Sequence, residues 1–234
     1  MAKLNNKFLE FEKIYVDLRQ REGWLLNDES VRLLPKVKKG SNQYSQWRLR
    51  AHSSKKTLSF LRTQERGRIL DLGCGNGWMS NQMAKEGFLV TGMEVNKTEL
   101  DQAQRVFGNS IQWELEDVFN YQPRHKFELI LLSASLQYFE DLETLFSKLF
   151  SLMMDGGSIL VMDTFIYEES DRESAKQRSE EYYKSQEAPE MAAHYFHHTW
   201  KALSSYQIEY IYRPKRKWRG IIRSPFPIFR VLKP

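Results

Sequence analysis

The sequence predicts an α/β fold of three layers, in which helices cover both faces of a mostly parallel, seven-stranded sheet. From residue 66 onward, short apolar runs alternate with amphipathic segments, as in consecutive βαβ units. Phe127–Leu132 is the strongest of these runs and has the character of a strand covered on both faces. A glycine-rich turn at Gly73–Gly77 separates the first run from the first amphipathic segment, as expected at a strand-to-helix junction.

Residues 1–65 are predicted to form a helical cap in front of the α/β region, which spans residues 66–234. In the first helix, apolar residues recur at helical spacing: Phe8, Phe11, Ile14, Tyr15 and Leu18. Pro35 and the polar run 36–41 predict a loop, and a second helix is expected from Gln43 to Leu61.

The elements of the α/β region follow in order along the chain. The strands expected to be parallel are Arg68–Leu72, Phe88–Glu94, Ile111–Leu115, Phe127–Leu132 and Ser158–Met162. The helices expected between them are Gly77–Lys85, Lys97–Phe107 and Leu142–Met153, with a turn at Asp155–Gly157. The polar segment 166–204 is predicted to be a helical insertion before the last two strands. Those strands, Tyr206–Tyr212 and Phe226–Leu232, are expected to pair in opposite directions, which gives the sheet an antiparallel last strand.

Composition narrows the class of protein. The chain has 234 residues, of which 41% are hydrophobic, enough for one domain with a core. No apolar run approaches the roughly 20 residues of a membrane helix. The start of the chain lacks the apolar stretch of a signal peptide, which favours a cytoplasmic location. The single cysteine, Cys74, excludes an internal disulfide bond.

The net charge of +5 is concentrated near the C-terminus, where no acid follows Glu209. The basic residues there are Arg213, Lys215, Arg216, Lys217, Arg219, Arg223, Arg230 and Lys233. Such a run can attract nucleic acid, anionic lipid or an anionic substrate. We favour a solvated hairpin loop, because most charge runs are simply surface.

Gly73, Gly75 and Gly77 lie where the first strand meets its helix, at the edge of the sheet where open α/β folds bind ligands. Glycine permits a sharp turn and the close approach of a ligand, which a Cβ atom would block. The helix that follows adds free N–H groups at its N-terminus. We therefore expect a ligand against this loop.

Two acids indicate which ligand binds there. Asp71 stands two residues before the first glycine, where its carboxylate suits an ammonium group or N–H donors and disfavours an anion. Glu94 ends the second strand, where a carboxylate can accept hydrogen bonds from both hydroxyls of a ribose. Together they favour a cationic nucleoside without a phosphate.

The glycine spacing also argues against a dinucleotide, whose fingerprint is G-x-G-x-x-G/A. Counted from Gly73, the sixth position is Trp78, which does not match. Counted from Gly75, it is Ser80, a marginal match that leaves an NAD(P) oxidoreductase as a weaker alternative.

The stretch Ile69–Ser80, ILDLGCGNGWMS, resembles the first motif of class I (Rossmann-like) S-adenosylmethionine-dependent methyltransferases. Val90–Asn96 resembles the second motif, whose acid, here Glu94, holds the ribose. Asp117 falls where the family keeps an acid near the adenine amino group. Phe127–Phe139 resembles the fourth-strand motif, including the loop that lines the sulfonium region.

The landmarks of the family occur in order over residues 66–163, ending with the turn Asp155–Ser158 before the fifth strand. Two details differ: Glu128 replaces the usual aspartate after Phe127, and Asp155 stands where proline is common. Neither touches the expected cofactor site. The resemblance implies S-adenosylmethionine as cofactor and S-adenosylhomocysteine as product. It also implies a set of cofactor-binding residues: Asp71, Gly73, Cys74, Gly75, Gly77, Glu94, Val95, Asp117, Val118, Ser133 and Gln137.

The methyl acceptor is expected to be a small molecule, methylated at oxygen, nitrogen or carbon. Ser133–Leu136 does not resemble the Asn/Asp-Pro-Pro-Tyr segment of family members that methylate amino groups of nucleic acids. The glutamate pair that resembles protein-arginine methyltransferases is also absent, and Cys74 lies in the cofactor loop, where a nucleophile is not expected. Two alternatives stay open: an RNA- or ribosome-directed enzyme that uses the basic C-terminal loop, and a non-catalytic S-adenosylmethionine-binding module.

His194 and Tyr138 are the candidate catalytic residues. If Met191–Trp200 is an α-helix, Glu190, His194 and His198 share one face, and Glu190 could hold His194 as a general base. Histidines that pack at a seam are the favoured alternative, and a zinc site is a weaker one, so we predict no metal. Tyr138 follows the fourth strand, where it would face the sulfonium, and packing beneath the next helix is an equal alternative.

Further residues could complete the site. Asp163 and Thr164 end the fifth strand at the same edge and could touch the acceptor. Arg48 or Arg50 could bind the carboxylate of the cofactor, although solvated helix charges are the favoured interpretation. The insertion 166–204 and the N-terminal helices are the expected cover of the acceptor site. The oligomeric state is left open.

Overall fold

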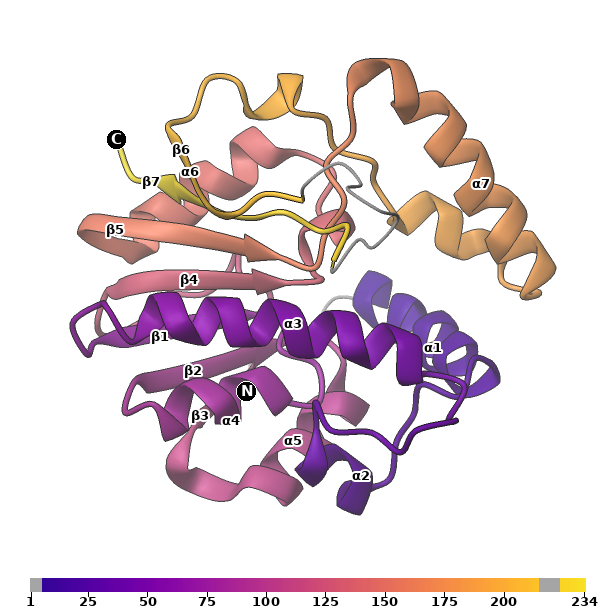
Figure 1. Cartoon of the computed structure of the whole chain (residues 1–234), viewed down its shortest axis with the longest axis horizontal. Coiled ribbons are helices and arrows are strands. Elements are labelled where there is room, and N and C mark those ends of the chain that lie inside the picture. The colour runs from indigo at the N-terminus through magenta and orange to yellow at the C-terminus, as the bar shows by residue number, and fades with distance from the viewer. Residues whose placement is uncertain (1–5, 215–223) are drawn as a thin grey trace.

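The sheet has the predicted class. The computed structural model describes residues 6–214 and 224–234, and these contain a seven-stranded sheet in the order β3-β2-β1-β4-β5-β7-β6 (Figure 1). The strands are β1 Arg68–Leu72, β2 Leu89–Glu94, β3 Gln112–Leu115, β4 Phe127–Ser133, β5 Met153–Met162, β6 Ile208–Tyr212 and β7 Ile228–Leu232. Strand β7 pairs antiparallel with β5 and β6, and the other pairs are parallel. The mostly parallel sheet with an antiparallel last strand is confirmed.

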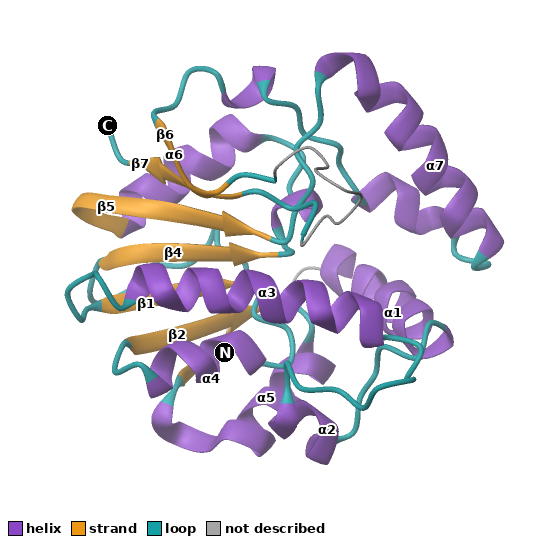
Figure 2. Ribbon diagram, in the orientation of Figure 1, coloured by secondary structure: helices purple, strands orange, loops and turns teal. Residues whose placement is uncertain are grey.

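Helices cover both faces of the sheet (Figure 2). They are α1 Asn6–Arg21, α2 Asp28–Leu33, α3 Tyr44–Leu61, α4 Trp78–Lys85, α5 Lys97–Phe107, α6 Leu142–Leu152 and α7 Arg172–Ser185. Side-chain caps define where two of these helices begin. The side chains of Asn96 and Asp141 accept hydrogen bonds from backbone N–H groups in the first turns of α5 and α6. The short helix α2 was not predicted.

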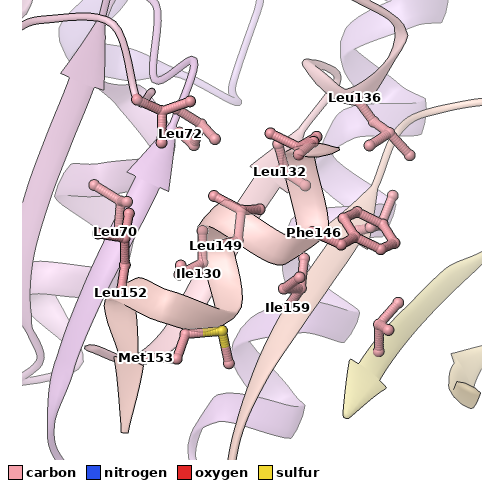
Figure 3. Close-up of a cluster of buried hydrophobic side chains, with 14 of the residues drawn as sticks. Leu70, Leu72, Ile130, Leu132, Leu136, Phe146, Leu149, Leu152, Met153 and Ile159 are labelled. Carbon is pink, nitrogen blue, oxygen red and sulfur yellow. The ribbon is translucent and has the colours of Figure 1, made fainter. Parts of the chain in front are cut away.

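Strand β4 shows why an apolar run becomes a central strand. Ile130 and Leu132 pack with α6 on one face, where Figure 3 shows them near Phe146 and Leu149. The alternate residues, such as Leu131, belong to the cluster that contains residues of α3, α4 and α5 on the other face. Since successive side chains of a strand point to opposite faces, a strand covered on both sides needs apolar residues at nearly every position.

The direction of the parallel strands determines at which edge of the sheet a ligand site is expected. Strands β1, β2, β4 and β5 run parallel and end at one edge of the sheet, toward the side on which α1 and α7 lie (Figure 2). Helix α3 packs on the face of the sheet, where the Thr57 hydroxyl donates a hydrogen bond to Sδ of Met162 across 3.3 Å. The expected boundary between a cap and an α/β domain at residue 65 stays a prediction.

One local prediction was wrong. The expected turn Asp155–Gly157 lies inside β5, which begins at Met153 because this buried residue pairs with Phe127. The register then shifts before Leu129 pairs with Ser158, so the extra residues form an irregularity within the strand. The predicted helical insertion is present, as α7 and short 3-10 segments before and after it. Over the described parts of the chain, no helix has the length and apolar character needed to cross a membrane.

Candidate functional site

One cavity of about 870 Å³ opens at the carboxyl edge of the sheet, bordered by α1, α3 and the loops after β1, β2, β3 and β4. Most of the residues expected to bind the cofactor line it: Asp71, Gly73, Cys74, Gly75, Glu94, Val95, Asp117, Val118, Ser133 and Gln137. Both candidate catalytic residues, Tyr138 and His194, line it as well. Gly77 is the one expected residue that lies outside the lining.

Packing inside the protein gives the glycine loop a physical basis in addition to the expected one. A Cβ atom on Gly73 would lie 2.6 Å from Cβ of Ser135, and one on Gly77 would lie 2.5 Å from the ring of Trp113. These two glycines are therefore required by packing inside the protein. Gly75 is less confined, since its Cβ would lie 3.5 Å from the Glu99 carboxylate, an ordinary contact distance. All three glycines have positive φ angles of 73°, 53° and 75°, which other residues rarely adopt.

Asp71 is a buried acid at the cavity wall. Its Oδ2 accepts a 2.5 Å hydrogen bond from the Ser80 hydroxyl, and its Oδ1 has no partner among the described residues. Burial raises the pKa of Asp71 to about 7, because it outweighs the Ser80 hydrogen bond and is reinforced by the charge of Glu94. A buried carboxylate oxygen without a partner suits a cationic ligand group.

Glu94 joins the end of β2 to the glycine loop. Its carboxylate accepts hydrogen bonds from the N–H groups of Gly75 at 2.9 Å, Val95 at 2.9 Å and Asn96 at 3.1 Å. Burial raises the pKa of this carboxyl, whereas the three N–H donors favour its ionised form. Glu94 therefore shapes the loop in addition to lining the cavity, and its contact with a ribose stays a prediction.

Glu99 is a further acid in the wall that was not predicted from the sequence. Its carboxylate lines the cavity and accepts no hydrogen bond from a described residue. Burial, and then the charge of Glu94, raise the pKa of Glu99 to about 7 against the opposing charges of Arg19 and Arg50. The sequence could have indicated this residue, because Glu99 lies in the first turn of α5, near the cap residue Asn96 at the carboxyl edge of the sheet.

Two arginines face these acids across the cavity, Arg19 from α1 and Arg50 from α3. The Arg50 guanidinium lies over the rings of Trp24 and Trp47, at 5.1 and 5.2 Å from their centroids. This differs from the solvated helix charge that was favoured. Arg48, on the same helix, is exposed and lies outside the lining.

The histidine face predicted for Met191–Trp200 does not form. Pro189–His194 is a 3-10 helix, after which the chain is extended, with Phe196 N–H donating to the Gln137 carbonyl at 2.7 Å. This pairing with a neighbouring segment outweighs the local helical pattern. Glu190 is exposed and borders a different surface hollow, whereas the His194 ring lies edge-on to Phe11 at 5.3 Å. Glu190 therefore does not hold His194.

The other two histidines are structural. A ring nitrogen of His197 lies 2.8 Å from the Ser179 hydroxyl on α7, and one of His198 lies 3.3 Å from the Leu136 carbonyl. Burial lowers the pKa of both. His197 joins two parts of the insertion, and His198 attaches the insertion to the loop after β4. No cluster of three potential metal ligands of the His, Cys, Asp or Glu type occurs in the described residues.

The remaining candidates lie beside the cavity. Asp163 is buried but outside the lining, and the Thr164 hydroxyl donates a 3.0 Å hydrogen bond to Oε1 of Gln137. Thr164 thus supports a residue that lines the cavity. Contrary to expectation, neither Asp163 nor Thr164 lines the cavity itself.

The basic C-terminal end is only partly described. Arg230 pairs with Glu209 at 2.6 Å and Lys233 with Asp155 at 2.8 Å, so these two charges are balanced. Arg213 lies over the ring of Tyr210, 3.7 Å from its centroid. The others lie outside the described residues: Lys215, Arg216, Lys217, Arg219 and Arg223.

Comparisons with known proteins agree with the resemblance. A family model described as a methyltransferase domain matches residues 44–207. An uncharacterized methyltransferase of Mycobacterium tuberculosis is 32% identical over 100 residues, which are 42% of this chain and 50% of that protein. Malonyl-(acyl-carrier protein) O-methyltransferase 1 of Ilyobacter polytropus is 28% identical over 127 residues, 52% of this chain and 47% of that protein. The chain spans about half the length of these curated relatives.

Two solved structures have a similar fold. The N-methyltransferase NodS from Bradyrhizobium japonicum, in complex with S-adenosylhomocysteine, aligns with a TM-score of 0.58 over 93% of this chain and 98% of that chain. Magnesium protoporphyrin IX methyltransferase from Synechocystis, with bound S-adenosylmethionine, aligns with a TM-score of 0.59 over all of both chains. Each is 15% identical to this chain, so the likeness concerns the fold alone.

Proposed function

Because the chain belongs to the methyltransferase-domain family, we propose that it is an enzyme that transfers a methyl group from S-adenosylmethionine to a small molecule. The acceptor atom is oxygen, nitrogen or carbon. The observation that supports this function best is that one cavity joins an acid-lined glycine loop to a wall of aromatic side chains. The first part has groups suited to a cationic nucleoside, and the second leaves room for an acceptor.

The acid-lined part fits the cofactor group by group. The unpartnered Oδ1 of Asp71 suits the ammonium group, and Arg50 suits the carboxylate. Glu94 stands at the end of β2, where it would accept hydrogen bonds from the ribose. Val118 and Asp117 follow β3, where they would hold the adenine ring and its amino group.

The chain's part in the reaction is to position the reactants. When bound, S-adenosylmethionine supplies a methyl group on a sulfonium, and methyl transfer is an in-line displacement that depends on alignment. Helix α1 and the segment at His194 border the cavity and would exclude water from it. His194 lines the acceptor part, where it could take a proton from the acceptor, and Tyr138 lines the same part, where its hydroxyl could form a hydrogen bond with the acceptor.

Calorimetry tests the cofactor half of this proposal. We expect S-adenosylhomocysteine to bind and NADH not to bind. Glu94→Ala should weaken binding, whereas Glu65→Ala, which changes an exposed residue outside the cavity, should leave it unchanged. Binding of NADH without binding of S-adenosylhomocysteine would overturn the proposal.

A further inference from the structure

Four rings form one wall of the cavity: Phe11 and Tyr15 of α1, Tyr138 after β4, and His194. We call these four residues the aromatic wall. Phe11 meets Tyr138 edge-on at 5.9 Å and His194 edge-on at 5.3 Å, and Tyr15 meets Tyr138 edge-on at 6.1 Å. Segments far apart in sequence therefore meet in one set of ring contacts, as aromatic pairs prefer.

The aromatic wall is supported from behind. Phe11, Tyr15 and Tyr138 pack against a buried cluster made of Leu18, Tyr183, Ala188 and Met191. This packing holds the rings in place, so that their exposed faces and edges form a preformed surface. Preformed apolar walls with a few polar groups are typical of small-molecule sites.

Tyr138 supplies the polar group of the wall. Its hydroxyl oxygen accepts a 3.1 Å hydrogen bond from the Arg19 guanidinium, and its own O–H donates to no described residue. The phenol proton is therefore available to a ligand in the cavity. A charged donor on the oxygen polarises the phenol and makes it a stronger donor.

Arg19 does not offer a free positive charge at this wall. Its guanidinium forms an ion pair with Glu22 at 2.6 Å and lies over the Tyr15 ring, 4.8 Å from the centroid. Glu22 also accepts a hydrogen bond from the Tyr182 hydroxyl. The carboxylate of Glu99 borders the same cavity. Arg50, the other arginine that faces this acid, is assigned to the cofactor carboxylate under the proposed function, so a negatively charged acceptor would meet an acid and no free arginine.

We propose that the aromatic wall binds the methyl acceptor, and that this acceptor is a planar aromatic or heteroaromatic molecule without net negative charge. It carries an oxygen or nitrogen that accepts a hydrogen bond from Tyr138. This inference rests on the proposed function and specifies its substrate class.

Matched probes test the class. Protein saturated with S-adenosylhomocysteine is titrated with benzamide, with its saturated analogue cyclohexanecarboxamide and with its anionic analogue benzoate, and dissociation constants are measured by ligand-observed NMR. We expect benzamide to bind about tenfold more tightly than either analogue, which corresponds to roughly 1.4 kcal/mol. Tight binding of cyclohexanecarboxamide would overturn the requirement for a planar ring, and tighter binding of benzoate would overturn the charge argument.

Variants test the residues. Tyr138→Phe removes the donor and keeps the ring, so it should weaken benzamide binding about fivefold to tenfold. Phe11→Leu should weaken benzamide while leaving the weak cyclohexanecarboxamide signal unchanged. Tyr206→Phe, outside the cavity, is the matched control. If Tyr138→Phe binds benzamide as wild type does, the assigned donor is wrong.

The saturation step separates the two proposals. If S-adenosylhomocysteine does not bind, the proposed function fails and this inference fails with it. If S-adenosylhomocysteine binds and none of the aromatic probes does, the proposed function stands and only the acceptor class is overturned.

Discussion

Gly73 and Ser135 are in such close contact that a Cβ atom on Gly73 would lie 2.6 Å from Cβ of Ser135. The Ser135 hydroxyl also donates a 2.6 Å hydrogen bond to the carbonyl oxygen of Leu72. These contacts join the loop after β1 to the loop after β4, and both loops line the cavity. The shape of the site therefore depends on this junction.

Gly73→Ala should open that junction. A matched control exists in Gly156, whose φ of 76° is close to the 73° of Gly73 but whose Cβ would meet nothing within 4 Å. Gly156→Ala should cost about 1–2 kcal/mol of unfolding free energy, from backbone strain alone. Gly73→Ala should cost more and abolish binding of S-adenosylhomocysteine. Equal costs in denaturant unfolding, with binding retained, would contradict this.

Asp71→Asn should weaken S-adenosylhomocysteine binding about tenfold or more, because a charge-assisted contact with the ammonium group is lost. Binding of 5′-methylthioadenosine, which lacks the amino-acid part, should change little. Burial raises the pKa of Asp71 to about 7, and only the ionised form attracts a cation. Wild-type affinity for S-adenosylhomocysteine should therefore increase from pH 6 to pH 8, and calorimetry should find a smaller increase in the variant.

Arg50→Met should weaken S-adenosylhomocysteine about tenfold, because the carboxylate loses its cationic partner. It should spare 5′-methylthioadenosine, which has no carboxylate. Arg48→Met, on the exposed side of the same helix, is the control. If Arg50→Met weakens both ligands equally, the role of Arg50 is its packing on Trp24 and Trp47.

Asp163→Asn should stabilise the protein in a pH-dependent way. Asp163 is buried, and neither of its carboxylate oxygens has a hydrogen-bond partner within the described part of the chain. Burial raises its pKa from 3.8 to about 6, against the opposing effects of Arg50 and Ser53. The folded state therefore loses stability as the pH rises from about 4 to 6, and the cost is complete above that range.

The gain from Asp163→Asn should be about 1 kcal/mol at pH 4.5 and about 3 kcal/mol at pH 7.5, as upper values from the pKa shift. Asparagine also tolerates the positive φ of 55° at this position. Denaturant unfolding at both pH values measures the gain. Asp17→Asn, at an exposed position, should show no such difference. A gain that is equal at the two pH values would contradict the assigned ionisation.

The sequence by itself determined most elements of this protein and the edge of the sheet at which the cavity opens. The helix expected at Lys97–Phe107 has those bounds in the structure, and β4 begins at Phe127 as expected. Such elements are visible in sequence because the periods of helices and strands, caps and glycine turns are local properties of the chain. Glu94 could be placed for the same reason, since it ends a recognisable strand.

Only the tertiary structure decided what faces the cavity. The hydrogen bond between Arg19 and Tyr138 joins residues 119 positions apart, and no local pattern predicts such a contact. A side chain at position 77 would collide with the Trp113 ring, which belongs to another element. His194 ends a 3-10 helix, because the chain after it pairs with Gln137 instead of continuing as an α-helix. The physical reason is the same for these three features. Each depends on packing between segments that are far apart in sequence, and the neighbouring residues in the chain do not reveal the free energy of that packing.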